Sequence, residues 1–535
     1  MRCDANMTTM SAAAPAHAEE HMQGQQAPAL VVFSGGTAFN TVATLLRDKV
    51  TTRVSHVLPV SDDGGSTAEI VRVLGGPAVG DIRSRCLRLS DASTAEARAV
   101  KTLLGHRLRR DDDELAKREW YEILELESPL WEGVSEPYKQ TIKAFLVQFQ
   151  TQLLRHNDGG GGGGSRSSAA MPLSTSSFSS SSSSSFGATT TGAAASDADG
   201  NTGNNNGSEK FCFRNGSVGN FFFAGARTFF RSLDAAIFLY SRVSGIPQES
   251  YVLPVIQSDD RLLLGAELSS GTLIRGQNEI SHPPSTGTTM GGDDDDMMSP
   301  RGGRMSVNKG AGWSRLPSPI RRVLYLSTEG GSQHEVFPQV NPSVLQRLSE
   351  SDCIVFGMGS LYTSICPALI LPGIGEAVAA RRNVPKVLIL NGSEDRETAG
   401  MSAVDIVLAV QSSLNRSWGE YGDEEAHANG AGADDNATKG GVAASGGWAT
   451  SPPALRLRER EIESLEHGVD EYITAVLYPL GCGHEIDEDA LKRVGIDNVV
   501  PVASRRTDDD EVIYERDALV ATIRDIVTSS FTVHR

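Results

Sequence analysis

Apolar and polar positions follow two different periods along this chain. Continuous apolar runs, typical of buried strands, occupy residues 29–34, 55–60, 322–327, 352–357, 386–391 and 498–502. Apolar residues three and four positions apart predict helices at 40–48, 93–105, 112–126, 137–155, 219–239, 342–350, 367–380, 401–410, 455–480 and 515–527. Strands separated by helices of this length favour an α/β fold, with a mostly parallel sheet covered by helices on both faces.

Three further strand-like runs have no helix between them. They occupy residues 251–256, 262–268 and 272–280. Because short neighbouring strands pair most simply with their own sequence neighbours, these runs predict an antiparallel edge or flap.

Four stretches are too poor in apolar residues to belong to a packed core. Residues 1–27 predict a disordered N-terminus, and residues 157–208, 281–316 and 413–452 predict low-complexity insertions. The first insertion contains six consecutive glycines, Gly159–Gly164. Since the cost of closing a loop grows slowly with its length, we expect one α/β domain over residues 28–530, interrupted by the three insertions.

Composition excludes some partners. The chain has 49 basic and 67 acidic residues, a formal net charge of −18, whereas binders of nucleic acid or anionic membranes carry a basic surplus. The six cysteines form no CxxC pair, which favours a reducing compartment. No apolar run reaches the ~18 residues of a membrane-spanning helix. We therefore expect a cytoplasmic protein whose main partner is neither nucleic acid nor membrane.

A glycine turn follows the first predicted strand and leads into a helix. Gly35, Gly36 and Thr37 let the backbone bring N–H groups close to an anion at the positive end of that helix. Asn40, the first residue of the helix, joins the candidate binding residues. The pattern fits either a nucleotide-phosphate loop or a plain strand-to-helix turn.

Two adjacent acids, Asp62 and Asp63, follow the second strand, before Gly64, Gly65 and Ser66. Adjacent carboxylates repel each other, so at least one usually finds a cation, a donor-rich ligand or a raised pKa. The alternative is structural, because Asp63 or Ser66 could cap the helix that begins near residue 67.

A third segment places Asp81 two residues before Arg83. These residues could form an internal ion pair, or the guanidinium could hold a phosphate or carboxylate through two hydrogen bonds. Asn220, near the start of a Phe-rich helix, is either the cap of that helix or an amide that contacts a nucleoside or sugar.

A second glycine-hydroxyl loop follows the strand predicted at 352–357. It supplies Gly357, Gly359, Ser360 and Ser364, and Asn391 ends the next strand. In a parallel sheet ligands bind beyond the carboxyl ends of the strands, so all these turns are candidates for one ligand site.

Taken in order, these segments resemble the 2-phospho-L-lactate transferase (CofD) superfamily, close to its gluconeogenesis-factor (YvcK-like) branch. The family patterns Gly-Gly-Thr-Gly, Asp-Asp-Gly-Gly-Ser, Pro-x-Gly-Asp-Ile-Arg-Asn, Leu-Gly-Asn, Gly-x-Gly-Ser-Leu-Tyr-Thr-Ser-Ile-x-Pro and Pro-Gly-Ile-x-Glu-Ala are matched by residues 35–37, 62–66, 77–84, 218–220, 357–367 and 372–377. Two departures are Ala38, in place of the last glycine of the first loop, and Ser84, in place of an Asn.

The resemblance implies a Rossmann-like fold that binds a nucleotide diphosphate conjugate or a nucleotide sugar, and a homodimer. Asp62, Asp63 and Arg83 would be catalytic, and the two acids would also hold Mg²⁺. Residues 35–37 and 357–360 would hold phosphates, and Asn220 would contact the nucleoside or sugar.

Two functions remain open. The first is Mg²⁺-dependent transfer of a phosphoryl-linked group to an acceptor hydroxyl, as in phospholactate transferases. The second is a non-catalytic regulator of carbon metabolism or morphology that binds a nucleotide sugar, as the gluconeogenesis-factor branch implies.

Overall fold

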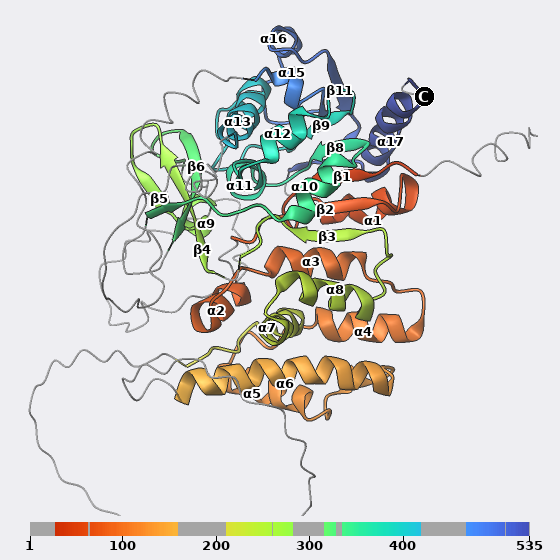
Figure 1. The fold of residues 1–535 in the computed structure, drawn as a ribbon, viewed down its shortest axis with the longest axis vertical. Coiled ribbons are helices and arrows are strands. Elements are labelled where there is room, and N and C mark those ends of the chain that lie inside the picture. Colours follow the sequence, from red (N-terminus) through yellow and green to blue (C-terminus); the bar gives the residue numbers. More distant parts are fainter. Residues whose placement is uncertain are drawn as a thin grey trace, which may run out of the picture.

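The computed structural model describes residues 27–61, 65–158, 210–258, 260–281, 315–327, 334–418, 467–508 and 510–533 (Figure 1). Most of the three predicted insertions and almost all of the predicted N-terminal extension lie outside these residues. So do Asp62, Asp63 and Gly64.

A seven-stranded parallel sheet forms the centre of the fold, in the order β11-β10-β9-β8-β1-β2-β3. Its strands are β1 (Leu30–Phe33), β2 (Val54–Leu58), β3 (Tyr251–Pro254), β8 (Cys353–Phe356), β9 (Lys386–Ile389), β10 (Ala475–Pro479) and β11 (Asn498–Val502). Every residue of β1, β2, β8 and β9 is buried, as expected for strands covered on both faces. The predicted α/β fold with a mostly parallel sheet is confirmed.

The strand order reverses direction between β1 and β8. From β1 the chain moves outward through β2 to β3, and it then returns to build β8, β9, β10 and β11 on the other side of β1. In open parallel sheets the crevice beyond the carboxyl ends of such a pair is the usual ligand site.

Two groups of helices pack on the sheet. In one, α1 (Asn40–Lys49) contacts α17 (Arg516–Val533) and α3 (Gly80–Leu89). In the other, α12 (Ile374–Ala379) contacts α10 (Pro342–Ser349), α13 (Ala403–Arg416) and α15 (Val469–Tyr472). No helix in the described part of the chain combines the length and the hydropathy needed to cross a bilayer.

The connection from β2 to β3 builds a helical lobe beside the sheet, in the lower half of Figure 1. Its elements are α2 (Gly65–Leu74), α3, α4 (Ala95–Gly105), α5 (Asp113–Leu124), a short 3₁₀ turn (Pro129–Trp131), α6 (Glu136–Asp158), α7 (Val218–Phe230) and α8 (Leu233–Val243). The lobe core is aromatic, with the rings of Phe149 and Phe221 stacked at 4.5 Å and Trp120 edge-on to Phe221 at 4.9 Å. The single helix predicted at 219–239 was wrong. Arg231 adopts a left-handed conformation (φ 53°) and Ser232 caps α8, so the chain turns between two helices.

The close packing of α6 on α7 gives a stability prediction. A methyl group at Gly225 would overlap the backbone carbonyl oxygen of Phe145 on α6. We expect Gly225→Ala to lower the free energy of unfolding by about 2 kcal/mol or more, because backbone atoms cannot move aside as a side chain can. Chemical denaturation will measure this. The control is Gly105→Ala, where the new methyl group would meet only the methyl groups of Leu87. Equal stability of the two variants would contradict the prediction.

A separate antiparallel sheet forms the flap, with strand order β5-β4-β6-β7. It consists of β4 (Leu262–Leu268), β5 (Leu273–Arg275), β6 (Ile320–Ser327) and β7 (His334–Val336). Helix α9 (Gln277–Ser281) follows β5 in the sequence. The flap prediction was right for 262–268 and for residues 273–275 of the run 272–280. It was wrong for 251–256, which is the parallel edge strand β3, and residues 277–281 are helical. Residues 322–327 belong to this flap and not to the parallel sheet.

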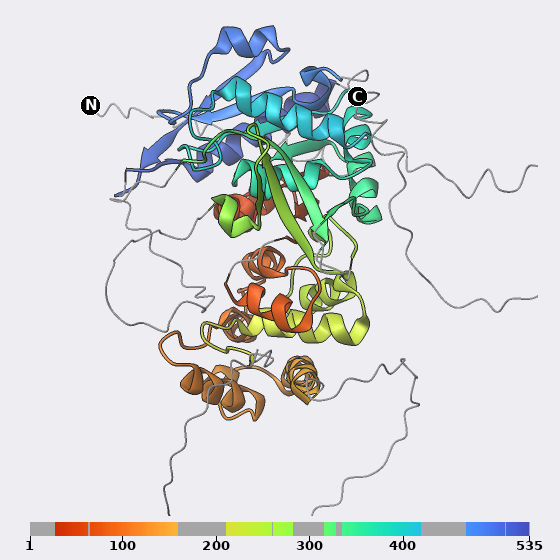
Figure 2. The same ribbon diagram turned by 90° about the vertical axis from the view of Figure 1, so that its left-hand side faces the viewer.

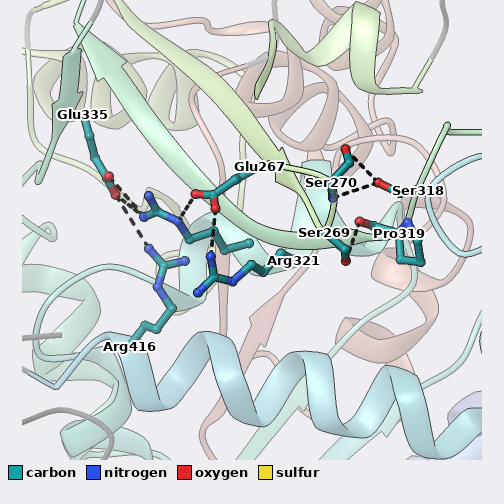
Figure 3. A network of polar contacts seen from close by, with 9 residues as sticks. Glu267, Ser269, Ser270, Ser318, Pro319, Arg321, Glu335 and Arg416 are labelled. Atoms are coloured by element: carbon teal, nitrogen blue, oxygen red, sulfur yellow. Dashed lines mark hydrogen bonds and ion pairs between the residues drawn. The ribbon is translucent and has the colours of Figure 1, made fainter. Parts of the chain in front are cut away.

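An ion network attaches the flap to α13, and Figure 3 shows its members. Arg322 pairs with Glu267 (Nε to Oε2, 2.6 Å) and with Glu335 (Nη1 to Oε1, 2.8 Å). Arg416 of α13 donates to the carbonyl oxygen of Val323 at 2.9 Å and lies 3.7 Å from Glu335. Figure 2 shows the flap strands facing the viewer on this side of the molecule.

Several other predicted elements differ from those in the structure. The helix predicted at 367–380 is divided into α11 (Cys366–Leu369) and α12, because Gly373 between them has φ 89°. A π-helical turn (Leu361–Ile365) precedes α11. The helix predicted at 455–480 was wrong at its end, where β10 pairs between β9 and β11. The sequence patterns also missed α16 (Glu488–Arg493) and the hairpin of β12 (Ser504–Arg506) and β13 (Val512–Tyr514). Helix α13 continues to Arg416, past the residue 413 at which the third insertion was expected to begin.

Candidate functional site

The two predicted glycine loops meet at the carboxyl ends of β1 and β8. A Cβ atom added to Gly35 would lie 2.8 Å from the Oγ atom of Ser364, and one added to Gly359 would lie 3.4 Å from the backbone nitrogen of Gly35. The loops are therefore in contact at the point where the strand order reverses. Gly357 is also required for packing, because a Cβ there would lie 2.7 Å from the ring of Phe39.

Asn391 holds the second loop from the end of β9. Its Nδ2 donates to the carbonyl oxygen of Gly359 at 2.8 Å, and its Oδ1 accepts from the Gly359 N–H at 3.2 Å. Both polar atoms of the Asn391 side chain are thus used to position Gly359. Ser360 and Ser364 stay partly exposed beside them.

The N-terminus of α1 opens toward the first loop. Helix α1 has no side-chain cap, whereas α4, α7 and α8 are capped by Thr94, Ser217 and Ser232. Thr37 is exposed, and its N–H forms no hydrogen bond with the residues that the structure describes. Free N–H groups at a helix N-terminus favour an anion.

Helix α3 packs against the first loop through its first turn. A Cβ atom at Gly36 would overlap the carboxyl group of Asp81. Burial raises the pKa of the Asp81 carboxyl, and the nearby Arg85 guanidinium and the Gly36 N–H oppose that rise. The suggested Asp81–Arg83 ion pair is not formed between these two described side chains.

Arg83 points to a second part of the site. Its Nε donates to the Oδ1 atom of Asn220 at 3.2 Å, and Asn220 donates in turn to the hydroxyl groups of Ser66 (3.0 Å) and Thr67 (3.2 Å). This series of hydrogen bonds reaches the start of α2, which follows Asp62, Asp63 and Gly64 in the sequence. Asn220 is not the cap of α7, because Ser217 accepts the capping hydrogen bond. The two Nη atoms of Arg83 make no hydrogen bond with any residue that the structure describes, although the side chain is 7% exposed.

The sequence patterns missed Arg85, which lies fully buried beneath the first loop. Arg85 bonds to the Oδ1 atom of Asn40 and to the carbonyl oxygen of Gly35. Asn40 also donates to the hydroxyl group of Ser84 at 2.8 Å. The amide of Asn40, predicted as a binding group, is therefore engaged within the protein. The excess of Arg in 83–88 was the available signal.

Glu397 was also missed, because nothing in its local sequence marks it as buried. Its carboxylate accepts hydrogen bonds from the N–H groups of Tyr362 (2.8 Å) and Thr363 (3.1 Å) and from the hydroxyl groups of Thr363 and Ser281. Burial, and secondarily the charge of Asp395, raise the pKa of Glu397 to about 7. Glu397 thereby anchors the π-helical turn that follows the second loop.

The predicted metal ligands cannot be placed, since Asp62 and Asp63 lie outside the described residues. Elsewhere in the described chain, no three His, Cys, Asp or Glu side chains are grouped so that they could hold a metal ion. Asp62 and Asp63 therefore stay a prediction as Mg²⁺ ligands.

Comparison with known proteins agrees with the motifs. A family model described as 2-phospho-L-lactate transferase CofD matches residues 30–431. An uncharacterized protein of Saccharomyces cerevisiae is 30% identical over 431 residues, which cover 73% of this chain and 84% of the yeast protein. A putative gluconeogenesis factor of Nostoc is 26% identical over 195 residues, which cover 36% of this chain and 33% of that protein.

A solved structure supports the fold. The crystal structure of a Bacillus halodurans protein matches with a TM-score of 0.50 and 16% identity, covering 93% of this chain and 99% of that one. At this identity the match concerns the fold alone. The family model and the yeast relative, however, each extend over more than two thirds of the sequence. The chain belongs to the 2-phospho-L-lactate transferase CofD family.

Proposed function

We propose that this protein binds the diphosphate of a nucleotide conjugate at the β1–β8 crevice and transfers a phosphoryl-linked group to an acceptor hydroxyl. The observation that carries the proposal is the contact between the two glycine loops beside the uncapped start of α1. Such an arrangement supplies N–H groups and a helix dipole to an anion.

The side chains around the loops have roles that suit this transfer. The loop residues Gly35, Gly36 and Thr37, together with Gly357, Gly359 and Ser360, would hold the phosphates. Arg83 would stabilise the charge of the transferred group through its two Nη atoms, while Asn220 orients Arg83.

The reaction requires few covalent steps from the protein. The acceptor oxygen attacks the phosphorus, the bond from that phosphorus to the bridging oxygen breaks, and a nucleoside monophosphate leaves. Asp62 or Asp63 would take the proton of the acceptor hydroxyl. Mg²⁺ held by the same acids would neutralise phosphate charge. The remaining work is positioning, which the glycine loops, Arg83 and Asn220 provide.

A second candidate function is a nucleotide-sugar-binding regulator without catalysis. It is favoured by the similarity of segments of this chain to gluconeogenesis factors, such as that of Halalkalibacterium halodurans, 42% identical over 67 residues. Both functions require the loops, but only the transferase requires a proton acceptor at Asp62 or Asp63.

The variant Asp63→Asn separates the two functions. Calorimetry with GDP, UDP and UDP-sugars, with and without Mg²⁺, measures binding, and release of nucleoside monophosphate from a bound conjugate measures turnover. We expect Asp63→Asn to retain binding within about tenfold and to lower turnover at least 100-fold. Asp497→Asn, at an exposed position before β11, is the control and should change neither.

Turnover in Asp63→Asn equal to that of the wild-type protein would exclude Asp63 as the proton acceptor, and Asp62→Asn would then have to abolish turnover. Binding of nucleotide sugars without turnover in the wild-type protein would favour the regulator. If no nucleotide binds, both functions are wrong.

A further inference from the structure

Arg85 is a buried cation surrounded by neutral acceptors. Its Nε donates to Asn40 Oδ1 (2.6 Å), its Nη1 contacts His56 Nδ1 (2.8 Å), and its Nη2 donates to Ser34 Oγ (3.2 Å) and to the Gly35 carbonyl oxygen (3.0 Å). The guanidinium also lies over the ring of Phe39, 5.3 Å from its centre. The whole side chain is 0% exposed.

Asp81, one turn earlier on α3, is the acidic group whose charge acts on Arg85, and Arg85 acts on it in return. The two side chains form no ion pair, and no carboxylate of the described residues lies within 4 Å of the guanidinium. His56 is neutral, because burial and the charge of Arg85 hold its pKa well below the usual range. Burial lowers the pKa of Arg85 only to about 10, so the guanidinium stays charged at neutral pH.

A buried cation that no carboxylate contacts is expensive, and an anion nearby stabilises it. Here the guanidinium bonds to the inner side of the first glycine loop, through Ser34 and the Gly35 carbonyl. The N–H of Gly35 makes no hydrogen bond with the described residues. The same loop is the one proposed above for phosphate, and Arg85, which is 0% exposed, contacts it from the buried side.

The geometry points to Arg85 as a positioning residue that also supplies the internal counter-charge for the phosphates on the first glycine loop. This role rests on the proposed function, and it adds a residue that the family motifs do not mark. Arg85 does not touch the ligand. It fixes Gly35 and Asn40 and places one positive charge behind the loop, where solvent screens it weakly.

A purely structural role for Arg85 makes a different prediction. In that case only the hydrogen bonds matter, and Arg85→Lys and Arg85→Gln, which both disturb the bonds to Asn40 and to the loop, would weaken phosphate binding equally. A counter-charge acts on phosphates and leaves the binding of an uncharged nucleoside unchanged. Charge and hydrogen bonding can be separated by two substitutions, since Arg85→Lys keeps the charge and Arg85→Gln keeps an amide without charge.

The test measures the affinity of the full chain for inorganic pyrophosphate, GDP, UDP and the nucleosides guanosine and uridine by calorimetry. We expect Arg85→Gln to weaken pyrophosphate and diphosphate binding by about 30-fold or more and nucleoside binding by less than about threefold. Arg85→Lys should stay within about fivefold of the wild-type protein for all ligands. Arg416→Met, which removes a guanidinium between α13 and the flap, should leave every affinity unchanged.

Several results would overturn the role of Arg85. They are equal losses in Arg85→Lys and Arg85→Gln, equal losses for nucleosides and diphosphates, or no pyrophosphate binding by the wild-type protein. If Arg85→Gln does not fold, the Lys variant decides alone, because a loss of more than about 30-fold with the charge retained rejects the counter-charge. Binding of pyrophosphate but of no nucleotide would reject the proposed function and leave the role of Arg85 intact.

Discussion

Replacing Arg83 by glutamine is expected to weaken nucleoside diphosphate binding by about 30-fold or more. The reason is that the Nε atom of Arg83 is held by Asn220, while its Nη atoms are left without a partner among the described residues. A hydrogen bond to a charged group contributes about 1.5–3 kcal/mol, and glutamine supplies neither the charge nor the second donor in the same plane.

The stability of this variant should change little. Glutamine is long enough to reach the Oδ1 atom of Asn220, so the chain of hydrogen bonds to Ser66 and Thr67 can persist. The control is Arg88→Gln, since Arg88 lies exposed on the same helix α3. Calorimetry measures affinity, and thermal unfolding measures stability. Unchanged affinity of Arg83→Gln, or an equal loss in Arg88→Gln, would show that Arg83 does not contact the phosphates.

Replacing Glu397 by glutamine is expected to raise the stability of the protein at pH 8 by about 3 kcal/mol. The pKa of Glu397 is raised to about 7 from its ordinary value of 4.5, chiefly by burial. Each unit of pKa difference corresponds to about 1.4 kcal/mol. Between pH 4.5 and 7 the folded state holds a proton that the unfolded state has released, so stability falls as pH rises through this range.

The glutamine variant should remove this dependence. Its amide oxygen can accept from the N–H groups of Tyr362 and Thr363, and its NH₂ group can donate to the hydroxyl groups of Thr363 and Ser281. Denaturant unfolding of both proteins from pH 4.5 to 8.5 should show equal stabilities at the acidic end and a gap that opens toward pH 7. Glu485→Gln, at an exposed position, is the control. A gap that is constant with pH would mean that Glu397 does not titrate in this range.

Local sequence patterns predicted several strands of the parallel sheet correctly. The strands β1, β2, β8 and β9 were found from continuous apolar runs, because a strand covered on both faces has no polar side to break the run. The edge strand β11 was also found, although most of its residues are partly or fully exposed. The glycine loops were found with them, since Gly35, Gly36, Gly357 and Gly359 mark sharp turns at strand ends. The order of the sequence motifs along the chain also indicated the family.

Other features depend on partners that are distant in the sequence. Runs 251–256 and 322–327 look alike as local patterns, yet β3 pairs with β2 in the parallel sheet while β6 pairs with β4 in the flap. Pairing between strands is decided by packing and by hydrogen bonds across hundreds of residues, which no local period contains. The strand β10 was read as helix for the same reason.

The candidate site likewise has features that the local sequence predicts and features that only the tertiary structure shows. The sequence by itself predicted which residues would serve a phosphate ligand: glycines at strand ends, Arg83 and Asn220. Only the tertiary structure decided that Gly35 and Gly359 lie in contact, that the amides of Asn40 and Asn391 serve the loops, and that Arg85 and Glu397 are buried beside them. Burial sets the energy of a charge, and burial is a property of the assembled sheet and helices rather than of neighbours along the chain.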